Sequence, residues 1–283
     1  MAEKAPAWVV PIMRAGYGAR AFVYLIVGGL ALWAVYWGGA AQGTQNALAD
    51  LKQVTFGNLL LWLIGLGLVA YMIWRLIDAA MDLEDEGAGA KGIVARGGQA
   101  VTGLIHGAIG LSIIRLGMGQ GGSGGSGAEN WTAKLMSLPY GPSLVAALGA
   151  AVIAAGLYYV QKGLRGEYRE DIRITPVTRK LDPLMKAGFV AEGVIVGTIG
   201  GFLLYAGLTS NPGEAGGVGQ ALGYIRALDY GAFFFAALAL GLLCFALENA
   251  VEAMYRILPR YAGPDVSTLA SRAKAKAKAH APS

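Results

Sequence analysis

The sequence predicts an all-α, polytopic membrane protein with six transmembrane helices, built as three parallel two-helix repeats with pseudo-threefold symmetry. Of the 283 residues, 55% are apolar and only 14% are charged, whereas a soluble globular protein has about 25% charged residues. The 44 glycines are scattered through apolar runs, which is typical of membrane helices that pack closely.

Six uncharged runs are long enough to cross a hydrocarbon core, which needs about 20 helical residues. They are Ala21–Trp37, Val54–Trp74, Gly97–Ile114, Leu135–Gln161, Gly193–Leu208 and Tyr230–Leu247. All but four of the 23 lysines and arginines lie in the N-terminal segment, the second and fourth connections or the C-terminal end; the exceptions are Lys52, Arg115, Lys134 and Arg226. Because basic residues are retained on the cytoplasmic side, we expect both termini in the cytoplasm. This topology explains the net charge of +5 without a nucleic-acid partner.

Each odd-numbered run opens with the same skeleton: a basic residue, a glycine two positions later and another glycine fourteen positions later. The three stretches are Arg14–Gly28, Arg96–Gly110 and Lys186–Gly200. Each even-numbered run begins with an aromatic–glycine pair: Phe56-Gly57, Tyr140-Gly141 and Tyr230-Gly231. These runs reach Arg75, Lys162 and Asn249 at equal steps of 87 residues. Since each two-helix unit enters and leaves on one side, the copies are parallel, unlike the inverted repeats of many transporters.

The repeats resemble a bacterial family of integral membrane proteins, the domain-of-unknown-function family numbered twelve hundred and six. Its members carry three tandem two-helix units, each opened by a basic-x-Gly-aromatic-x-x-Arg-Gly-x-x-Tyr-like stretch. Arg14 to Gly28 fits that opening, with Ala21 in place of the expected glycine. The later copies depart from it at Thr102, His106, Glu192 and Val196. The resemblance covers about Arg14 to Arg256 and implies a bacterial cytoplasmic (inner) membrane protein, without an established activity.

The repeats divide the chain into five parts. Residues 1–13 form an N-terminal cytoplasmic segment, 14–86 repeat one, 87–166 repeat two, 167–257 a cytoplasmic connection with repeat three, and 258–283 a basic tail. We expect the tail to be disordered when free. Each of its lysines adds about 1 kcal/mol of attraction near an anionic leaflet, so anionic lipid is its expected partner, a solubilising end is the alternative, and no nucleic-acid partner is expected.

Glycines at equivalent positions predict helix-packing faces, because helices in lipid associate through close contact at small residues. Two repeats hold a Gly-x-x-x-Gly pair followed three residues later by another glycine: Gly103, Gly107 and Gly110, and Gly193, Gly197 and Gly200. In the first repeat only Gly28 remains of this set. Packing within the chain is the first interpretation, and a homo-oligomer interface is the alternative.

Polar side chains inside the spans form a second pattern. Arg20, Thr102 and Glu192 share one repeat position, about 9 Å inside the cytoplasmic edge at 1.5 Å per helical residue. On the even spans, Trp74, Gln161 and Glu248 are equivalent and fall in about the same layer, next to Arg75 and Lys162.

Ionisable side chains inside a span are costly, so they usually pair or have a function. We expect Arg20 and one of Arg75 or Lys162 to neutralise Glu192 and Glu248. Ion pairs that only fix the packing of the repeats are the first interpretation. A proton or cation relay through the carboxylates and snorkelling to the surface are the alternatives.

His106 is the deepest titratable group, ten residues after Arg96. We expect a neutral imidazole that is hydrogen-bonded to a carbonyl or hydroxyl on a neighbouring helix. A proton carrier near neutral pH or a cofactor ligand is the alternative.

Catalytic motifs are scarce. Cys244 is the single cysteine, and the two histidines lie far apart, which leaves no disulfide framework and no hydrolase triad. Gly117-x-Gly119-x-x-Gly122 matches a dinucleotide fingerprint, but it ends a span without a βαβ unit, so we expect a flexible external linker. We therefore predict no enzyme, no cofactor and no metal site.

The sequence thus favours a non-enzymatic scaffold, assembly factor or accessory subunit that acts through helix packing. Its expected partners are the lipid bilayer and a membrane protein or a second copy of the chain. A proton- or ion-coupled transporter or channel is the alternative, motivated by the intramembrane carboxylates and His106. An intramembrane enzyme ranks third, since a nucleophile or metal set is lacking.

Overall fold

A computed structural model describes residues 8–38, 47–48, 52, 55–119 and 127–257 of the chain. Its six long helices are α1 (Val9–Trp37), α3 (Gly57–Met81), α4 (Ala90–Gly117), α6 (Gly141–Arg165), α7 (Pro176–Thr209) and α9 (Gly231–Tyr255). Each is long and apolar enough to cross a membrane. Shorter elements are α5 (Gly127–Met136), α8 (Val218–Ala227), and the 3₁₀ turns η2 (Glu167–Asp171) and η3 (Pro212–Glu214). The predicted all-α fold with six spans is confirmed.

Five of the six long helices are longer than the predicted spans, chiefly at the ends that carry charge, whereas α6 is shorter. Uncharged runs mark only the part of a helix that is compatible with hydrocarbon, whereas helices continue into their charged flanks. The predicted start of the fourth span at Leu135 is wrong, because Leu135 belongs to α5 and α6 begins at Gly141.

The aromatic–glycine pair forms the same turn in every repeat. Phe56, Tyr140 and Tyr230 each precede a long helix with φ near +60°, a left-handed conformation that bulky residues rarely adopt. At Gly141 and Gly231 an added Cβ would overlap backbone carbonyl oxygens of the preceding helix. The pair therefore encodes a tight entry into each even span.

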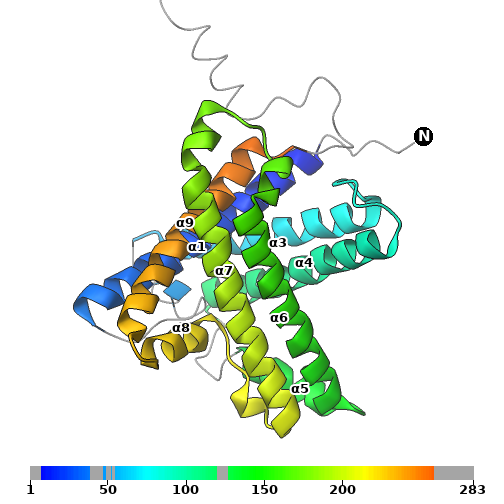
Figure 1. The fold of residues 1–283 in the computed structure, drawn as a ribbon, viewed down its shortest axis with the longest axis vertical. Helices are drawn as coiled ribbons and strands as arrows, with labels where there is room; N and C mark the ends of the chain where they lie inside the picture. Colours follow the sequence, from blue (N-terminus) through cyan, green and yellow to red (C-terminus); the bar gives the residue numbers. More distant parts are fainter. Residues whose placement is uncertain (1–7, 39–46, 49–51, 53–54, 120–126, 258–283) are drawn as a thin grey trace, which may run out of the picture.

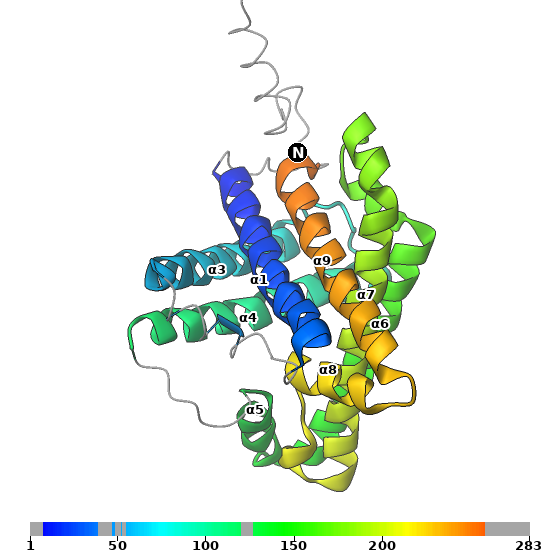
Figure 2. The same ribbon diagram turned by 90° about the vertical axis from the view of Figure 1, so that its left-hand side faces the viewer.

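The long helices pack mainly in pairs that cross repeat boundaries: α9 with α1, α3 with α4, and α6 with α7. Figure 1 shows α6 and α7 side by side, with α3 and α4 lying across their direction, and Figure 2 shows α1 and α9 between these two pairs. Each pair joins the second long helix of one repeat to the first long helix of the next repeat. In the same way, α9 of the third repeat packs on α1 of the first repeat.

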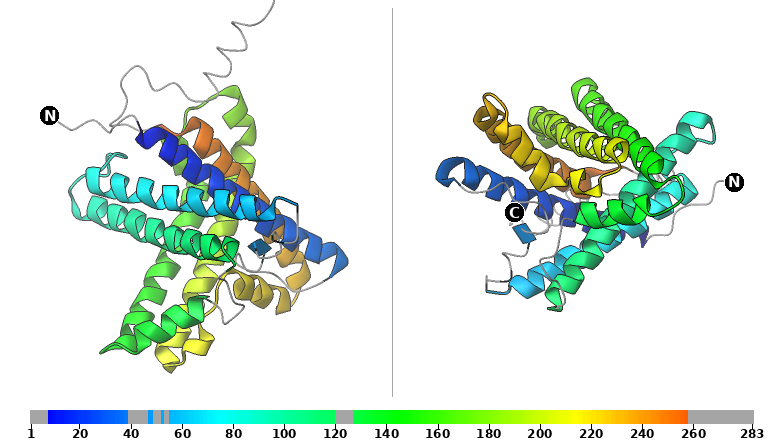
Figure 3. Two further views of the ribbon diagram at one scale, coloured as in Figure 1. Left: turned by 180° about the vertical axis from the view of Figure 1, so that it is seen from behind. Right: turned by 90° about the horizontal axis from the view of Figure 1, so that it is seen from below.

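Contacts inside a repeat, which we call junctions, are unequal. The α1–α3 and α7–α9 junctions are packed, but α4 and α6 are not packed against each other in this way. The two views of Figure 3 show the α3–α4 pair diverging from the α6–α7 pair. Two of the three junctions are therefore filled and one is open, and a threefold relation among the repeats stays a prediction.

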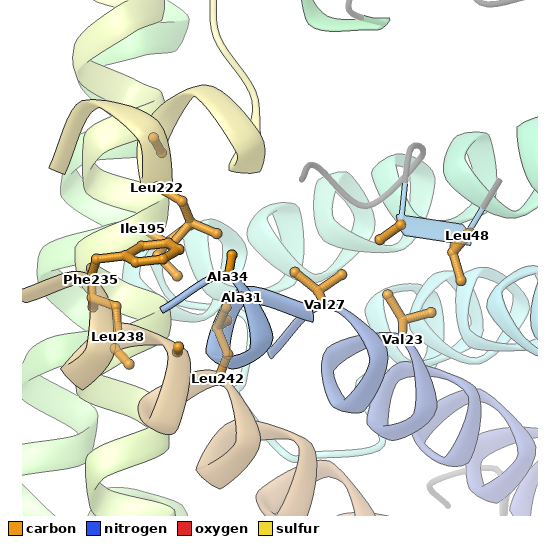
Figure 4. Packing of buried hydrophobic residues seen from close by; sticks show 14 of the residues in the cluster. Val23, Val27, Ala31, Ala34, Leu48, Ile195, Leu222, Phe235, Leu238 and Leu242 are labelled. Carbon is orange, nitrogen blue, oxygen red and sulfur yellow. The ribbon is translucent and has the colours of Figure 1, made fainter. Parts of the chain in front are cut away.

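The main apolar core lies where α1 meets α9. Val23, Val27, Ala31 and Ala34 of α1 belong to this core together with residues of α7, α8 and α9. In Figure 4, Ala31 and Ala34 lie near the labelled residues of α9, whereas Val23 lies beside Leu48. The residues labelled on those other helices are Ile195, Leu222, Phe235, Leu238 and Leu242. This core holds α1 and α9 together at the centre of the molecule.

Parts of two predictions lie outside the described residues. They are the disordered basic tail, residues 258–283, and the flexible linker at residues 120–126.

Candidate functional site

Arg20 of α1, a member of the predicted polar layer, is almost fully buried. Its Nη1 donates to the hydroxyl of Tyr71 at 2.9 Å, and its guanidinium carbon lies 4.7 Å from the centre of that ring. Such a cation–π contact strengthens when it is removed from water. The Nε of Arg20 is buried without a hydrogen-bond partner.

The two glutamates of the layer are also buried. Glu192 of α7 accepts a hydrogen bond of 2.6 Å from the hydroxyl of Tyr24 on α1. Glu248 of α9 forms no hydrogen bond or ion pair with any residue that the structure describes. Next to it, the Oδ1 of Asn249 has no partner, and the Nε1 of Trp74 on α3 is likewise unpaired.

The predicted neutralisation of these glutamates by ion pairs is wrong. Arg75 pairs with Asp78 at 3.2 Å and Glu84 at 3.1 Å, and Lys162 pairs with Asp171 at 2.8 Å. Both bases therefore reach out of the layer towards acids at the end of α3 and in the connections. Their long, flexible side chains allow this, because the charged head can extend well beyond its own helix turn.

These bases belong to a larger network that we call the charge clasp. It consists of Arg75, Asp78, Glu84, Lys162, Asp171, Glu252 and Arg256. Arg256 binds Glu84 and Glu252 and lies 3.9 Å from Asp171. The clasp thereby joins the end of α9 to both connections that follow α3 and α6.

Two base–acid pairs of the clasp occupy equivalent positions in repeats one and two. Arg75 with Glu84 and Lys162 with Asp171 are the same pair, 87 residues apart. In repeat three the equivalent positions are Asn249 and Leu258, and Arg256 approaches the acids of the other two repeats instead. Backbone bonds reinforce this contact: Arg173 N donates to Tyr255 O at 2.9 Å, and Ile257 N donates to Asp171 O at 2.8 Å.

Burial and opposite charge set the protonation of the clasp outside the helices. Burial by itself would raise the pKa of Glu84, but the attraction of Arg256 and Arg75 outweighs it and lowers that pKa to about 2. Burial and then repulsion from Glu84 and Asp171 raise the pKa of Glu86, the exposed neighbour of the clasp. Burial opposes the charge of Arg256, yet Glu252 and Glu84 hold its pKa well above its usual range. Glu84 and Arg256 are therefore both ionised at neutral pH.

His106 lies beside the polar layer, with its ring 5.0 Å from the Tyr71 ring in an edge-on arrangement. Its Nδ1 donates to the carbonyl of Thr102 at 2.8 Å. The bond is to its own helix, whereas the prediction placed the acceptor on a neighbouring helix. The bond orients the imidazole, and the described residues hold no cluster of three or more metal-ligating side chains.

The predicted packing glycines lie at the helix pairs. An added Cβ would lie 2.8 Å from the Arg75 Cβ at Gly103 and would overlap Met72 at Gly107. An added Cβ at Gly110 would lie 2.8 Å from Gly65 O, and one at Gly193 would lie 2.6 Å from Gly156 O. An added Cβ at Gly200 would lie 2.6 Å from Ile153 N, and one at Gly28 would lie 3.1 Å from the Leu242 Cβ. A Cβ at Gly197 would meet nothing within 4 Å. All these positions except Gly197 point towards another helix of the same chain, and the backbone of Gly197 lies against Gly156 of α6.

The open junction leaves two helix faces uncovered. Val101 of α4 and Tyr158 of α6 are 50% and 53% exposed. At the equivalent positions of the filled junctions, Ala191, Tyr71 and Phe245 are buried and Ala19 is packed against the core. This contrast distinguishes repeat two from the others and was invisible in the sequence.

Sequence reasoning missed Tyr71 and did not pair Arg75 and Lys162 with the acids of the clasp. The signal for Glu84 and Asp171 was available, because each lies nine residues after a base and the two acids are 87 residues apart. Tyr71 carried a comparable signal, because the aromatic residues Tyr158 and Phe245 follow it at steps of 87 residues. Its hydroxyl accepts from both Arg20 and Arg75. It links the polar layer to the clasp.

Comparison with known proteins identifies three tandem repeats in the chain. A family model described as Domain of Unknown Function (DUF1206) matches residues 15–82, 97–166 and 187–256. The chain is 28% identical over 253 residues to the uncharacterized protein YxxB of Bacillus subtilis (strain 168), a match that covers 88% of this chain and 92% of that protein. No solved structure matches. Each matched segment covers most of the two long helices of one junction.

Proposed function

Because the chain belongs to the DUF1206 family, which brings no activity with it, we propose a function from the geometry: a non-enzymatic membrane scaffold, assembly factor or accessory subunit. It acts through helix packing and receives a partner at the open α4–α6 junction. It lies in the bacterial cytoplasmic membrane with both termini in the cytoplasm, as the distribution of basic residues favours.

The observation that carries this proposal is the inequality of the junctions. Three equivalent pairs of helix faces exist in one chain, and two of them are buried against each other. In lipid, helix faces associate through close packing rather than hydrophobic drive. A face that is packed in two repeats and free in the third is therefore suited to bind a helix from another chain.

The charge clasp supports a structural use of the buried charges. Its bases are paired with acids from different connections, and truncating one partner of a buried pair leaves an uncompensated charge. Such a network holds the three repeats in register while leaving the α4–α6 faces uncovered.

Native mass spectrometry tests the proposal on protein extracted from its own membrane in mild detergent. We expect a stoichiometric partner chain with the wild type, loss of most of that partner with Ala154→Trp, and retention with Leu157→Trp. Both sites are exposed on α6, but only Ala154 occupies the repeat position of Gly67 and Gly241, which pack against the odd span in the filled junctions. A wild-type protein without any partner, or equal retention by both variants, would contradict the proposal.

A second candidate function is proton- or ion-coupled transport. It is favoured by one observation: Glu248, the Nε of Arg20 and the Oδ1 of Asn249 are buried without partners. Buried polar atoms normally have a hydrogen-bond partner, so unpaired ones suggest water or an ion. Proton flux into liposomes, measured for the wild type and for Glu248→Gln and Glu192→Gln, tests it; flux lost in both variants would favour transport over the scaffold.

A further inference from the structure

We propose that the partner at the open junction is a second copy of this chain, with α4 of each copy packed on α6 of the other. This inference rests on the proposed function and names the partner of the same site. It is argued from the filled junctions, which show what these faces bind.

The filled junctions share one contact at the same repeat position. An added Cβ at Gly16 would lie 2.6 Å from the Cα of Tyr71, and one at Gly188 would lie 2.7 Å from the backbone nitrogen of Phe245. In each case a glycine of the odd span lets the backbone at an aromatic residue of the even span approach closely. The aromatic rings are thereby buried at the centre of the protein.

Repeat two retains both members of this contact but does not use them. The equivalent residues are Gly98 and Tyr158. A Cβ added at Gly98 would meet nothing within 4 Å, and Tyr158 is more than half exposed. The α4 face is therefore chemically matched to an α6 face that it does not touch.

Larger side chains one helical turn away from Gly98 and Tyr158 argue against direct packing of α4 on α6 within one chain. In the filled junctions a Cβ added at Gly67 or Gly241 would overlap the Cβ of Ala19 or Ala191, so only glycine opposite alanine allows that spacing. Repeat two has Ala154 opposite Val101, and helices with these larger side chains must stand farther apart.

Within one chain the spacing of α4 and α6 is not free. The α4 helix is held against α3 at Gly103, and α6 is held against α7 at Gly193 of α7. In addition, Arg256 of the clasp ties the connections that follow α3 and α6 to each other. A contact between two copies has no such constraint, because their separation adjusts to the larger side chains.

A twofold arrangement uses both free faces. If α4 of one copy packs on α6 of the other, symmetry makes the reverse contact as well, which gives a closed, isologous dimer. The two helices run in opposite directions across the membrane, so an axis along the membrane normal keeps their ends at matching depths. Each copy thereby covers the face that its partner leaves open.

Disulfide trapping tests this inference in the full-length protein in its membrane. The background is Cys244→Ala, which removes the single cysteine, and the test pair is Val101→Cys with Ala154→Cys. Oxidation should yield a covalent dimer. Co-expression of the two single variants on chains of different tag length should yield only the mixed dimer, because α4 of one chain meets α6 of the other.

Two control pairs fix the interpretation. Leu61→Cys with Gly117→Cys, across the α3–α4 pair, should cross-link within one chain, because an added Cβ at Gly117 lies 3.7 Å from the Leu61 Cβ, a spacing that suits a disulfide. Val101→Cys with Leu157→Cys should not cross-link. A disulfide within one chain at residues 101 and 154 would overturn the inference in favour of closure, and no disulfide at all would also overturn it.

Failure of this inference can be separated from failure of the proposed function. If no covalent dimer forms but Ala154→Trp still removes a different chain from the native complex, the second-copy inference fails and the scaffold function stands. If Ala154→Trp changes nothing in the native complex, the proposed function fails with it.

Discussion

Arg256 shows how one residue can replace a pair that a repeat has lost. Repeats one and two each bind a base to an acid nine residues later, whereas the third repeat has Asn249 and Leu258 at those positions. Arg256 contacts Glu84 of repeat one and approaches Asp171, which follows repeat two. A guanidinium suits this role, because it presents several donors in a fixed plane and stays charged when it is buried.

Replacing Arg256 with methionine should lower the free energy of unfolding by about 3 kcal/mol, because it leaves Glu252 buried without its partner. Unfolding in detergent, followed by circular dichroism, measures the change. The matched control is Arg165→Met, whose partner Glu167 lies at the surface, and it should cost no more than about 0.5 kcal/mol. Equal losses in the two variants would contradict a structural role for the clasp.

Acid should weaken the clasp through Glu84. Its folded pKa of about 2 lies below the usual value of 4.5, so the unfolded chain binds the proton first and the stabilisation is lost as the pH falls from about 4.5 towards 2. The thermal midpoint of the wild type should therefore fall more over this range than that of Glu84→Gln. Parallel curves for the two proteins would show that Glu84 does not carry the pH dependence.

At the scale of elements, glycine controls how closely two helices pack. On α6, Gly149, Gly156 and Gly163 recur every seven residues and all face α7. This spacing returns a residue to nearly the same side of the helix, so the glycines form one continuous groove. The sequence therefore shows that α6 has a face for close packing, but it does not show that α7 is the helix that packs there.

Two glycines of this pair should respond in opposite ways to alanine. A Cβ at Gly156 would lie 2.6 Å from the backbone nitrogen of Gly197, and backbone cannot move aside cheaply, so Gly156→Ala should cost about 1–3 kcal/mol. A Cβ at Gly197 meets nothing, and Gly197→Ala should be neutral or stabilise by up to about 1 kcal/mol. Thermal unfolding in detergent compares them, and a Gly197→Ala protein as unstable as Gly156→Ala would contradict this packing.

At the scale of the whole molecule, repetition in sequence does not produce equal junctions. The last span, α9, packs against the first span, α1. Three equal repeats would make the same contact. The divergence of the α3–α4 pair from the α6–α7 pair leaves α4 and α6, the two long helices of the second repeat, without the packing that the other junctions have. Packing across repeat boundaries therefore determines the architecture more than packing within a repeat.

Three equivalent glycines report this inequality. Gly16→Ala and Gly188→Ala should each destabilise the isolated monomer by about 1–3 kcal/mol, because the new methyl group meets backbone atoms. Gly98→Ala should leave the monomer unchanged, since its Cβ meets nothing, but it should reduce covalent dimer formation in the trapping experiment. Similar destabilisation by all three substitutions would show that the α4–α6 junction is closed in the monomer.

The sequence by itself determined the membrane fold, the six spans and the three repeats. Hydrocarbon imposes long uncharged runs, and the opening skeleton and the aromatic–glycine turn are local patterns that do not depend on distant contacts. Fixed steps between repeats also predicted one layer for Arg20, Glu192 and Glu248.

Only the tertiary structure decided which charges meet and which junction stays open. Arg75 and Lys162 reach acids outside the layer, and Glu84 lies against Arg256, 172 residues away, because helix directions set these approaches. Gly98 and Tyr158 have the residue types of a filled junction, yet they remain apart. The reason is physical: a residue type defines what a face can bind, whereas the crossing of the helix pairs defines what comes within its reach.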